Sequence, residues 1–500
     1  MAGRPYRVRM KGRWAVTGAL ALALALAALS PQANATPAPT APKTSPQVIA
    51  FYYGWYGNPT FDGEWIHWND KRFDIVPPDD ISSDYYPQLG AYSSRDPAVV
   101  RQHMDWLKRA KIGVIALSWW AGETSDAYVR QVLDAAKTAG IKVTLHIEPA
   151  TGRTASDYQA NVIRLVKKFG RHPAFFTTRL GSPHLAAGRP RALIFVWATA
   201  LVDGKVVPAS YWARANDAIH REVGALVLAC PCGGGYDIAV TKGRFDGAYN
   251  YATLHLEKEG GFDWARTLPP GAIYVPSVMP GNHADRIGYP KDTIVPRLDG
   301  ATYDEQWSAA LGTGVKPDFV SITSFNEWHE GSQIEPARSA YSAGGRTYLD
   351  FAPLSPTSYL DRTAGWVARY VSGDYPRPSS VKVRLRATTT SDWMAISFGS
   401  GSLARPGAPE ISAQATQGSF DGTKLTLNQS LERARSGLEV SLTAEALALG
   451  DTLTLVGNGG YIGRTTLIVD VWAGNAWMAA GEATWIGGPD DGATRTIELP

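Results

Sequence analysis

The amino-acid sequence predicts an α/β fold, a (β/α)8 TIM barrel, followed by a C-terminal all-β, sandwich-like domain. Between residues 48 and 325, eight short apolar runs recur, as expected of parallel strands that are covered on both faces. Amphipathic helical patterns separate several of these runs, and this alternation is typical of a parallel barrel. After residue 380, short runs alternate apolar and polar residues, which favours antiparallel strands.

Residues 1–35 are predicted to be a secretory signal peptide. Five basic residues precede a short apolar, Ala-rich run, and Ala33 to Ala35 offers a small-residue cleavage site. A signal anchor that stays in the membrane is the alternative, but the apolar run is short for a bilayer span. We therefore expect cleavage and secretion, with no membrane attachment afterwards. A tether rich in Pro, Thr and Ala follows at 36–47.

Composition limits the partners of the mature chain. Removal of the leader's five basic residues changes the net charge from +3 to −2, so nothing in the charge favours nucleic acid. We expect a monomer. The 17 Trp and 22 Tyr are many for this length; most are expected in cores, but pyranose rings also stack on such side chains.

Two cysteines, Cys230 and Cys232, occur in the chain. A bridge is conceivable in an exported protein, but cysteines two positions apart with a proline between them have poor disulfide geometry. We therefore expect no disulfide framework, and leave the state of the two thiols open.

The barrel is predicted to span 48–373. Its expected strands are 48–53, 113–119, 142–148, 192–198, 225–229, 247–252, 272–278 and 319–325. Helical patterns cover 96–111, 125–140, 156–170 and 302–314, whereas no clear helix separates the fifth and sixth strands. A linker at 374–380 leads to the β domain at 381–500. Four Trp residues of that domain belong either to a sugar-binding platform or to the hydrophobic core, and the core is favoured. They are Trp393, Trp472, Trp477 and Trp485.

Aromatic and acidic residues gather where the predicted strands end. In a (β/α)8 barrel the reactive groups lie at the carboxyl ends of the strands. A single Trp there more often packs under a loop, but a shared chemistry at six strand ends predicts a pocket for a ligand. These ends carry Tyr53, Trp119, Trp120, His146, Glu148, Trp197, Tyr251, Asn326, Glu327, Trp328, His329 and Glu330.

His146 and Glu148 are separated by one residue of the third strand. The period of two in a strand puts both side chains on the same side, so they are expected to face one space. A satisfied core histidine and a glutamate that caps the following turn are the alternatives.

Glu327 and Glu330 lie three residues apart after the eighth strand. Their spacing is compatible with three roles: a pair of metal ligands, a structural ion pair or an acid/base pair. A metal site would need further ligands at close spacing, and the run is not HExxH, so we expect no metal and no cofactor. Glycoside hydrolysis needs two carboxyl groups, one protonated to release the leaving oxygen and one ionised to assist the attack.

Ordered stretches of the chain resemble glycoside hydrolase family 99, the endo-α-1,2-mannosidases and endo-α-1,2-mannanases. They run from about residue 48 to 370 and include FYYGWYGNP, GEWIHWN, IGVIALSWW, KVTLHIEP, FDGAYNY and SITSFNEWHEGSQIEPA. The resemblance implies a metal-independent, retaining, endo-acting hydrolase of internal α-1,2-mannosidic bonds. The β domain lies outside it.

On this resemblance, Glu330 is the general acid/base that protonates the departing oxygen. Glu327 is the base towards the 2-hydroxyl of the reacting mannose, whose oxygen attacks C1 and gives a 1,2-anhydro sugar; this substrate-assisted route replaces a carboxylate nucleophile. The implied substrate-binding residues are Tyr53, Glu148, Tyr251 and Asn326 at the reacting sugar, Trp119, Trp120 and His146 at the neighbouring subsite, and Trp328.

Trp120 bears on the expected substrate. Animal relatives in the family tend to have tyrosine there and bacterial mannan-degrading members tryptophan, so α-mannan with Man-α-1,3-Man-α-1,2 units is expected. A mannosidase of glucosylated high-mannose N-glycans and a non-catalytic glycan-binding protein on the same fold are the alternatives. The stretches DKRFDIVPPDD, YNYATL and PGNHADRIGYP depart from the family pattern at the cleft, and they bear on substrate length and branching.

Overall fold

The computed structural model describes residues 43–375, apart from 151, 253, 255 and 257–260, and ten strands between residues 381 and 498. The predicted signal peptide, most of the tether and most of the linker lie outside the described residues. Within the described ranges, no helix combines the length and the apolar composition that a bilayer span requires.

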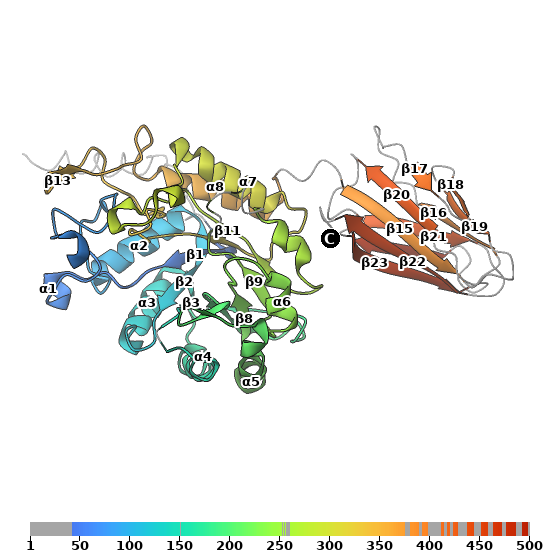
Figure 1. Cartoon of the computed structure of the whole chain (residues 1–500), viewed down its shortest axis with the longest axis horizontal. Coiled ribbons are helices and arrows are strands. Elements are labelled where there is room, and N and C mark those ends of the chain that lie inside the picture. The colour runs from blue at the N-terminus through green and yellow to red at the C-terminus, as the bar shows by residue number, and fades with distance from the viewer. Residues whose placement is uncertain are drawn as a thin grey trace, which may run out of the picture. The chain divides into compact units, whose positions relative to one another are not determined.

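A parallel barrel of eight strands forms the first described region, which confirms the predicted fold class (Figure 1). Each strand pairs with its neighbours in chain order, and the last strand pairs with the first through Val48 and Val320. A two-residue strand, β4 (Thr177–Thr178), pairs antiparallel with the fourth. The barrel strands are β1 (Ser45–Tyr52), β2 (Ile112–Trp119), β3 (Lys142–Ile147), β5 (Arg191–Val196), β8 (Leu226–Ala229), β9 (Gly247–Tyr249), β10 (Ile273–Val275) with β11 (Ser277–Val278), and β12 (Val320–Ile322).

The seventh barrel strand is divided at Pro276. Its first half, β10, pairs with β9, and its second half, β11, pairs with β12. Since proline has no N–H group, it interrupts the backbone ladder. The side chain of Asn250 continues the pairing: its Oδ1 accepts from the Ser277 N–H (2.9 Å), and its Nδ2 donates to the Ser277 carbonyl (3.3 Å). An asparagine side chain thus completes the ring of strands.

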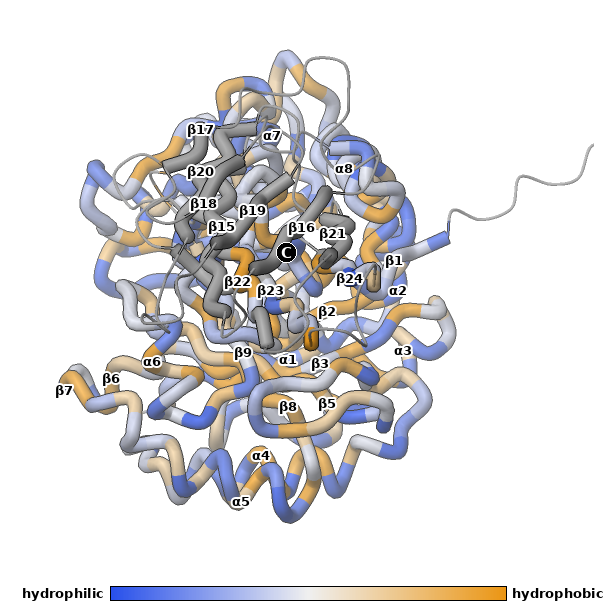
Figure 2. Tube along the Cα trace, turned by 90° about the vertical axis from the view of Figure 1, so that its right-hand side faces the viewer, coloured by the Kyte–Doolittle hydropathy of each residue, from blue (hydrophilic) through white to orange (hydrophobic). Residues whose placement is uncertain are grey.

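Helices cover the outside of the barrel (Figure 1). In Figure 2, α4 and α5 alternate hydrophobic and hydrophilic residues, as expected of helices with one buried face. Sequence signals fix several ends: Ser125 caps α3 and Thr154 forms a capping box with Asp157 at α4. The helices of this region are α1 (Pro59–Asp62), α2 (Pro97–Arg109), α3 (Asp126–Ala139), α4 (Ala155–Phe169), α5 (Ala213–Val223), α6 (Tyr236–Thr241), α7 (Ala301–Leu311) and α8 (Ser358–Ser372).

Aromatic rings fill the barrel below its carboxyl end. The ring of Phe51 contacts His146 (centroids 4.7 Å apart), Phe195 (5.7 Å) and Tyr249 (5.8 Å). All four side chains are buried, and they come from four different strands. These packed rings lie beneath the residues of the site.

Cys230 and Cys232, whose state the sequence left open, form a disulfide directly after β8. Their Cα atoms lie 5.1 Å apart, within the range that a disulfide spans. Cys232 has a positive φ of 55°, and this backbone turn brings two cysteines so near in sequence together. The bridge closes one loop and does not act as a framework.

Two five-stranded antiparallel sheets form the described part of the C-terminal domain, as the alternating runs predict. The sheets touch where an added Cβ at Gly481 would come within 2.7 Å of Ile497. Trp485 is buried and donates its indole N–H to the Ala493 carbonyl (2.9 Å), so it belongs to this core. One sheet contains β17 (Ser412–Gln414), β20 (Leu438–Ala444), β15 (Val381–Thr389), β22 (Arg464–Trp472) and β23 (Trp477–Ile486); the other contains β18 (Gly418–Phe420), β19 (Lys424–Asn428), β16 (Trp393–Phe398), β21 (Thr452–Asn458) and β24 (Ala493–Glu498).

Candidate active site

Three carboxyl groups converge at the carboxyl end of the barrel. Glu148 follows β3, while Glu327 and Glu330 belong to the loop after β12, which we call the catalytic loop (residues 323–335). Burial is the main cause that raises the pKa of Tyr53, and the negative charges of these three glutamates raise it further. The three acids therefore surround one phenol at the end of β1.

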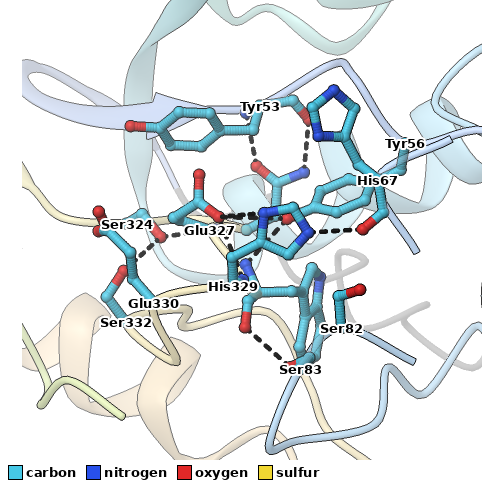
Figure 3. Close-up of polar contacts among 12 residues, drawn as sticks. Tyr53, Tyr56, His67, Ser82, Ser83, Ser324, Glu327, His329, Glu330 and Ser332 are labelled. Carbon is cyan, nitrogen blue, oxygen red and sulfur yellow. Dashed lines mark hydrogen bonds and ion pairs between the residues drawn. The ribbon is translucent and has the colours of Figure 1, made fainter. Parts of the chain in front are cut away.

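Glu327 is buried, with 3% of its surface exposed, and is held by three groups of the catalytic loop and of the segment that follows β1 (Figure 3). Its backbone N–H donates to Ser324 Oγ (2.7 Å). Its Oε1 accepts from the backbone N–H of His329 (3.1 Å) and from the hydroxyl of Tyr56 (3.4 Å). Both donors favour the ionised form of the carboxyl group.

Glu330 accepts one side-chain hydrogen bond, from the hydroxyl of Tyr251 to Oε2 (3.3 Å). The Tyr251 hydroxyl is in turn paired with that of Tyr53 (2.5 Å). The loop after β11 supports the Glu330 backbone, because the His283 N–H donates to the Glu330 carbonyl (2.7 Å).

Burial raises the pKa values of both catalytic-loop glutamates, and neighbouring negative charges raise them further, that of Glu330 at Glu327 and that of Glu148 at both. Burial, followed by the charge of Glu330, raises the pKa of Glu327 well above its usual range. Burial raises the pKa of Glu330 to about 7, against the opposing hydrogen bond from Tyr251. Two interacting carboxyl groups in a dry site share one proton over a range of pH. The site can therefore supply one carboxylic acid and one carboxylate at once.

Glu148 is oriented by neighbours from two strands. The Ser118 hydroxyl donates to Glu148 Oε1 (2.9 Å), and His146 Nδ1 lies 2.8 Å from the same oxygen. His146 Nε2 is paired with the hydroxyl of Tyr249 (2.7 Å). His146 and Glu148 thus face one space, as the period of two predicts.

An aromatic group adjoins the glutamates on the side of β1 and β2. Trp55 stacks on His67 (4.7 Å) and on His329 (6.0 Å), and the ring of Trp120 lies 6.3 Å from Trp55. Burial, and then the neighbouring His329, lower the pKa of His67 to about 4; burial also lowers the pKa of His329. Both imidazoles are therefore neutral near pH 7, and His329 Nε2 is paired with the His67 carbonyl (2.6 Å; Figure 3). The indole N–H of Trp120 is buried and has no hydrogen-bond partner among the described residues.

Trp119 does not lie with the site residues, which corrects its assignment as a substrate-binding residue. Its side chain is 3% exposed, and the guanidinium of Arg164 on α4 lies 5.8 Å from the centre of its ring. The physical reason is the strand period: Ser118 faces the barrel interior and reaches Glu148, so its neighbour Trp119 faces the helices.

Trp328 and Asn326 also differ from the expectation of sugar-binding side chains. Trp328 is fully buried and donates its indole N–H to Glu335 Oε2 (2.9 Å), beneath the catalytic loop. Asn326 is fully buried as well, and its amide pairs with both backbone groups of Tyr53 (2.7 and 2.8 Å). Both residues therefore position the groups that face the site.

The structure brings Tyr53, Trp120, His146, Glu148, Tyr251, Glu327 and Glu330 together as predicted by strand-end reasoning. That reasoning missed Tyr56 and Ser118, which hold Glu327 and Glu148. The period of two would have found Ser118, because it shares a face of the strand with Trp120, a predicted site residue. Across the described residues, no group of three or more His, Cys, Asp or Glu side chains is arranged to hold a metal ion.

Comparisons with known proteins agree with this geometry. A family model described as "Glycosyl hydrolase family 99" matches residues 44–372. A glycoprotein endo-alpha-1,2-mannosidase of Rattus norvegicus is 36% identical over 358 residues, which cover 65% of this chain and 74% of that protein. A glycoprotein endo-alpha-1,2-mannosidase of Xenopus laevis is 32% identical over 364 residues, with 64% and 76% covered.

A solved structure extends the comparison to three dimensions. The GH99 endo-alpha-mannosidase of Bacteroides thetaiotaomicron superposes with a TM-score of 0.57 at 31% sequence identity. The match covers 66% of this chain and 99% of that one. The similarity thus spans the barrel and the loops that carry both glutamates.

Proposed function

The chain belongs to glycosyl hydrolase family 99, and on that premise we propose that this glycoside hydrolase cleaves internal α-1,2-mannosidic bonds of α-mannan with retention of configuration. The observation that carries the proposal is the pair of buried glutamates on one loop, which lie beside Glu148 and two tyrosines and have raised pKa values.

The hydrogen bonds support different roles for the two glutamates. Glu327 accepts from two donors and Glu330 from one, so hydrogen bonding favours the carboxylate form more at Glu327, although burial and the charge of Glu330 raise the pKa of Glu327. On the hydrogen bonds we assign the proton to Glu330. Glu330 is then the acid that protonates the leaving oxygen as its bond to C1 breaks. Glu327 takes the proton of the 2-hydroxyl while that oxygen forms a bond to C1, which gives a 1,2-anhydro sugar.

Water completes the reaction by opening this strained ring. The water oxygen bonds to C1 and the bond from C1 to the 2-oxygen breaks, while Glu330 takes a proton from the water and Glu327 returns its proton to the 2-oxygen. Each step inverts C1, so the two steps together retain its configuration.

The mutational test replaces each glutamate by its amide. Glu330→Gln and Glu327→Gln are expected to lower kcat on α-mannan by about 10²–10⁴-fold, while oligosaccharide binding is largely kept. The control is Glu222→Gln on α5, an exposed glutamate paired with Lys167, which is expected to keep wild-type activity. Wild-type turnover by Glu330→Gln would contradict the assignment of Glu330 as the acid. Wild-type turnover by Glu327→Gln would contradict the substrate-assisted step.

A second candidate substrate is the glucosylated high-mannose N-glycan, because the relatives reported above are named glycoprotein mannosidases. Trp120 favours the mannan. Incubation of the protein with both glycans, followed by identification of the released oligosaccharides, decides between them. Binding of either glycan without any release would favour the non-catalytic alternative.

Secretion is part of the proposal. Residues 1–35 have the basic, apolar and small-residue regions of a cleaved leader, and α-mannan is a polysaccharide encountered outside the cell. We further propose that the mature enzyme works as a monomer.

A further inference from the structure

Two exposed aromatic side chains come from loops that pack against each other, although these loops are more than 200 residues apart in sequence. Phe73 ends the short 3-10 helix η1 (Lys71–Phe73) and is 41% exposed; Tyr289 follows η4 (Asp285–Ile287) and is 48% exposed. The Phe73 ring lies over Gly288, where an added Cβ would come within 2.7 Å of its Cζ atom. The glycine therefore leaves room for the ring beside Tyr289.

Polar contacts hold both loops in place. Asp70 accepts from the Arg72 backbone N–H (2.9 Å) and pairs with the Arg72 guanidinium, whose Cζ lies 5.2 Å from the centre of the Phe73 ring. In the other loop, the Arg286 guanidinium pairs with Asp80 (2.6 Å). Two large aromatic side chains are thus kept exposed on fixed backbone, which marks a binding surface.

The second loop adjoins Glu330. It begins with His283, whose N–H donates to the Glu330 carbonyl (2.7 Å), and an added Cβ at Gly331 would come within 2.5 Å of the His283 carbonyl. Burial, and then the charges of Glu330 and Glu327, raise the pKa of Tyr289, whereas the charge of Arg72 lowers it. Tyr289 therefore lies within the electrostatic reach of the catalytic pair, and the loop that carries it contacts the acid.

The acid must stand on the leaving-group side of the cleaved bond, because it donates its proton to the departing oxygen. Exposed aromatic rings next to the acid are suited to the apolar C–H faces of the sugars that depart. We propose that Phe73 and Tyr289 form an aromatic platform, which binds the mannose residues on the leaving-group side. This inference rests on the proposed endo-acting function. It names the residues that recognise the mannose residues on the leaving-group side.

The test compares two substrates that differ in the leaving group. One is an α-1,2-linked mannan oligosaccharide with at least two mannose residues on the leaving-group side, and the other is Man-α-1,3-Man α-fluoride, whose leaving group holds no sugar. For Tyr289→Ala and Phe73→Leu, the ratio of kcat/KM for the oligosaccharide to that for the fluoride is expected to fall about tenfold. Tyr289→Phe and Phe73→Tyr keep the rings, so a smaller fall is expected.

Phe61→Leu on α1 is the matched control, because Phe61 is an aromatic side chain of similar exposure (47%). It is expected to leave the ratio at the wild-type value. An unchanged ratio in both Tyr289→Ala and Phe73→Leu would overturn the platform and leave the proposed function intact. Failure of the wild-type protein to release oligosaccharides from α-mannan would overturn the function, and the platform with it.

Discussion

At the scale of single residues, the site combines acids with the surroundings that keep one of them protonated. Glu330 lies in a buried setting with one phenolic donor, and its pKa is raised to about 7. A general acid works best when its pKa lies near the working pH. On the proposed mechanism, burial thus has a catalytic use.

This burial predicts the alkaline limb of the pH profile. Because Glu330 must be protonated to act, kcat/KM is expected to fall as the pH rises through about 7. The Tyr251 hydroxyl stabilises the ionised form, so Tyr251→Phe is expected to raise the Glu330 pKa and shift the limb to higher pH. The measurement is kcat/KM between about pH 5 and 9 for both proteins. A limb that stays in place, or shifts to lower pH, contradicts the assigned acid.

Much of the site could be predicted at this scale, because barrel strands direct reactive groups to one end. The failures at Trp119 and Trp328 have separate causes. The prediction for Trp119 relied on its residue type and ignored the strand period, which places Ser118 in the barrel interior and Trp119 on the opposite face. For Trp328, sequence could not show that Glu335 and Tyr92 hold the indole beneath the loop.

At the scale of elements, a buried polar network supports the catalytic loop. Glu335 accepts from the Trp328 indole (2.9 Å) and from the Tyr92 hydroxyl (2.8 Å), and its other oxygen lies 3.2 Å from His103 Nε2 on α2. His103 Nδ1 is paired with the hydroxyl of Tyr52 on β1 (2.9 Å). The network thus joins the loop to a helix and to the first strand.

Glu335→Gln tests this support. An amide would turn an NH₂ group toward one of these donors, so the free energy of unfolding is expected to fall by about 1–3 kcal/mol. Urea denaturation measures the change, and Glu222→Gln, at an exposed site, is expected to stay within about 0.5 kcal/mol of wild type. Equal stability of Glu335→Gln and wild type would show that the network contributes little.

Element positions followed from sequence where the pattern was long. The predicted helices at 96–111, 125–140 and 156–170 match α2, α3 and α4 closely. By contrast, α6 has six residues, too few to give a periodic pattern between the fifth and sixth strands. The predicted strand 272–278 hides a division at Pro276 because both halves are apolar.

At the scale of the whole molecule, the catalytic barrel is closed by its own strands. The described strands β1, β2, β3, β5, β8, β9, β10 with β11, and β12 form the ring, and α8 follows them in the chain. The strands from β15 to β24 pair among themselves in two separate sheets. Neither hydrogen-bonded ladder takes a strand from the other region.

A chain that ends after residue 375 is therefore expected to fold and to cleave soluble mannan oligosaccharides. Its kcat/KM should stay within about threefold of the full-length value, because the catalytic residues and their supports belong to the barrel. Circular dichroism and initial rates are the measurements. A truncated protein that folds but loses activity would show that the β domain contributes to the site. Reduced cleavage of polymeric mannan alone would favour a polysaccharide-binding role for that domain.

The manner in which the barrel closes has a consequence for self-association. A continuous ring offers no unpaired main-chain edge to a strand of another molecule. At Pro276 this protection depends on the side chain of Asn250 and on a strand of two residues. If the barrel opened at this point, the main-chain edges of β9 and β12 would be exposed. Asn250 is therefore expected to protect the protein from aggregation, although it directly precedes Tyr251 of the active site.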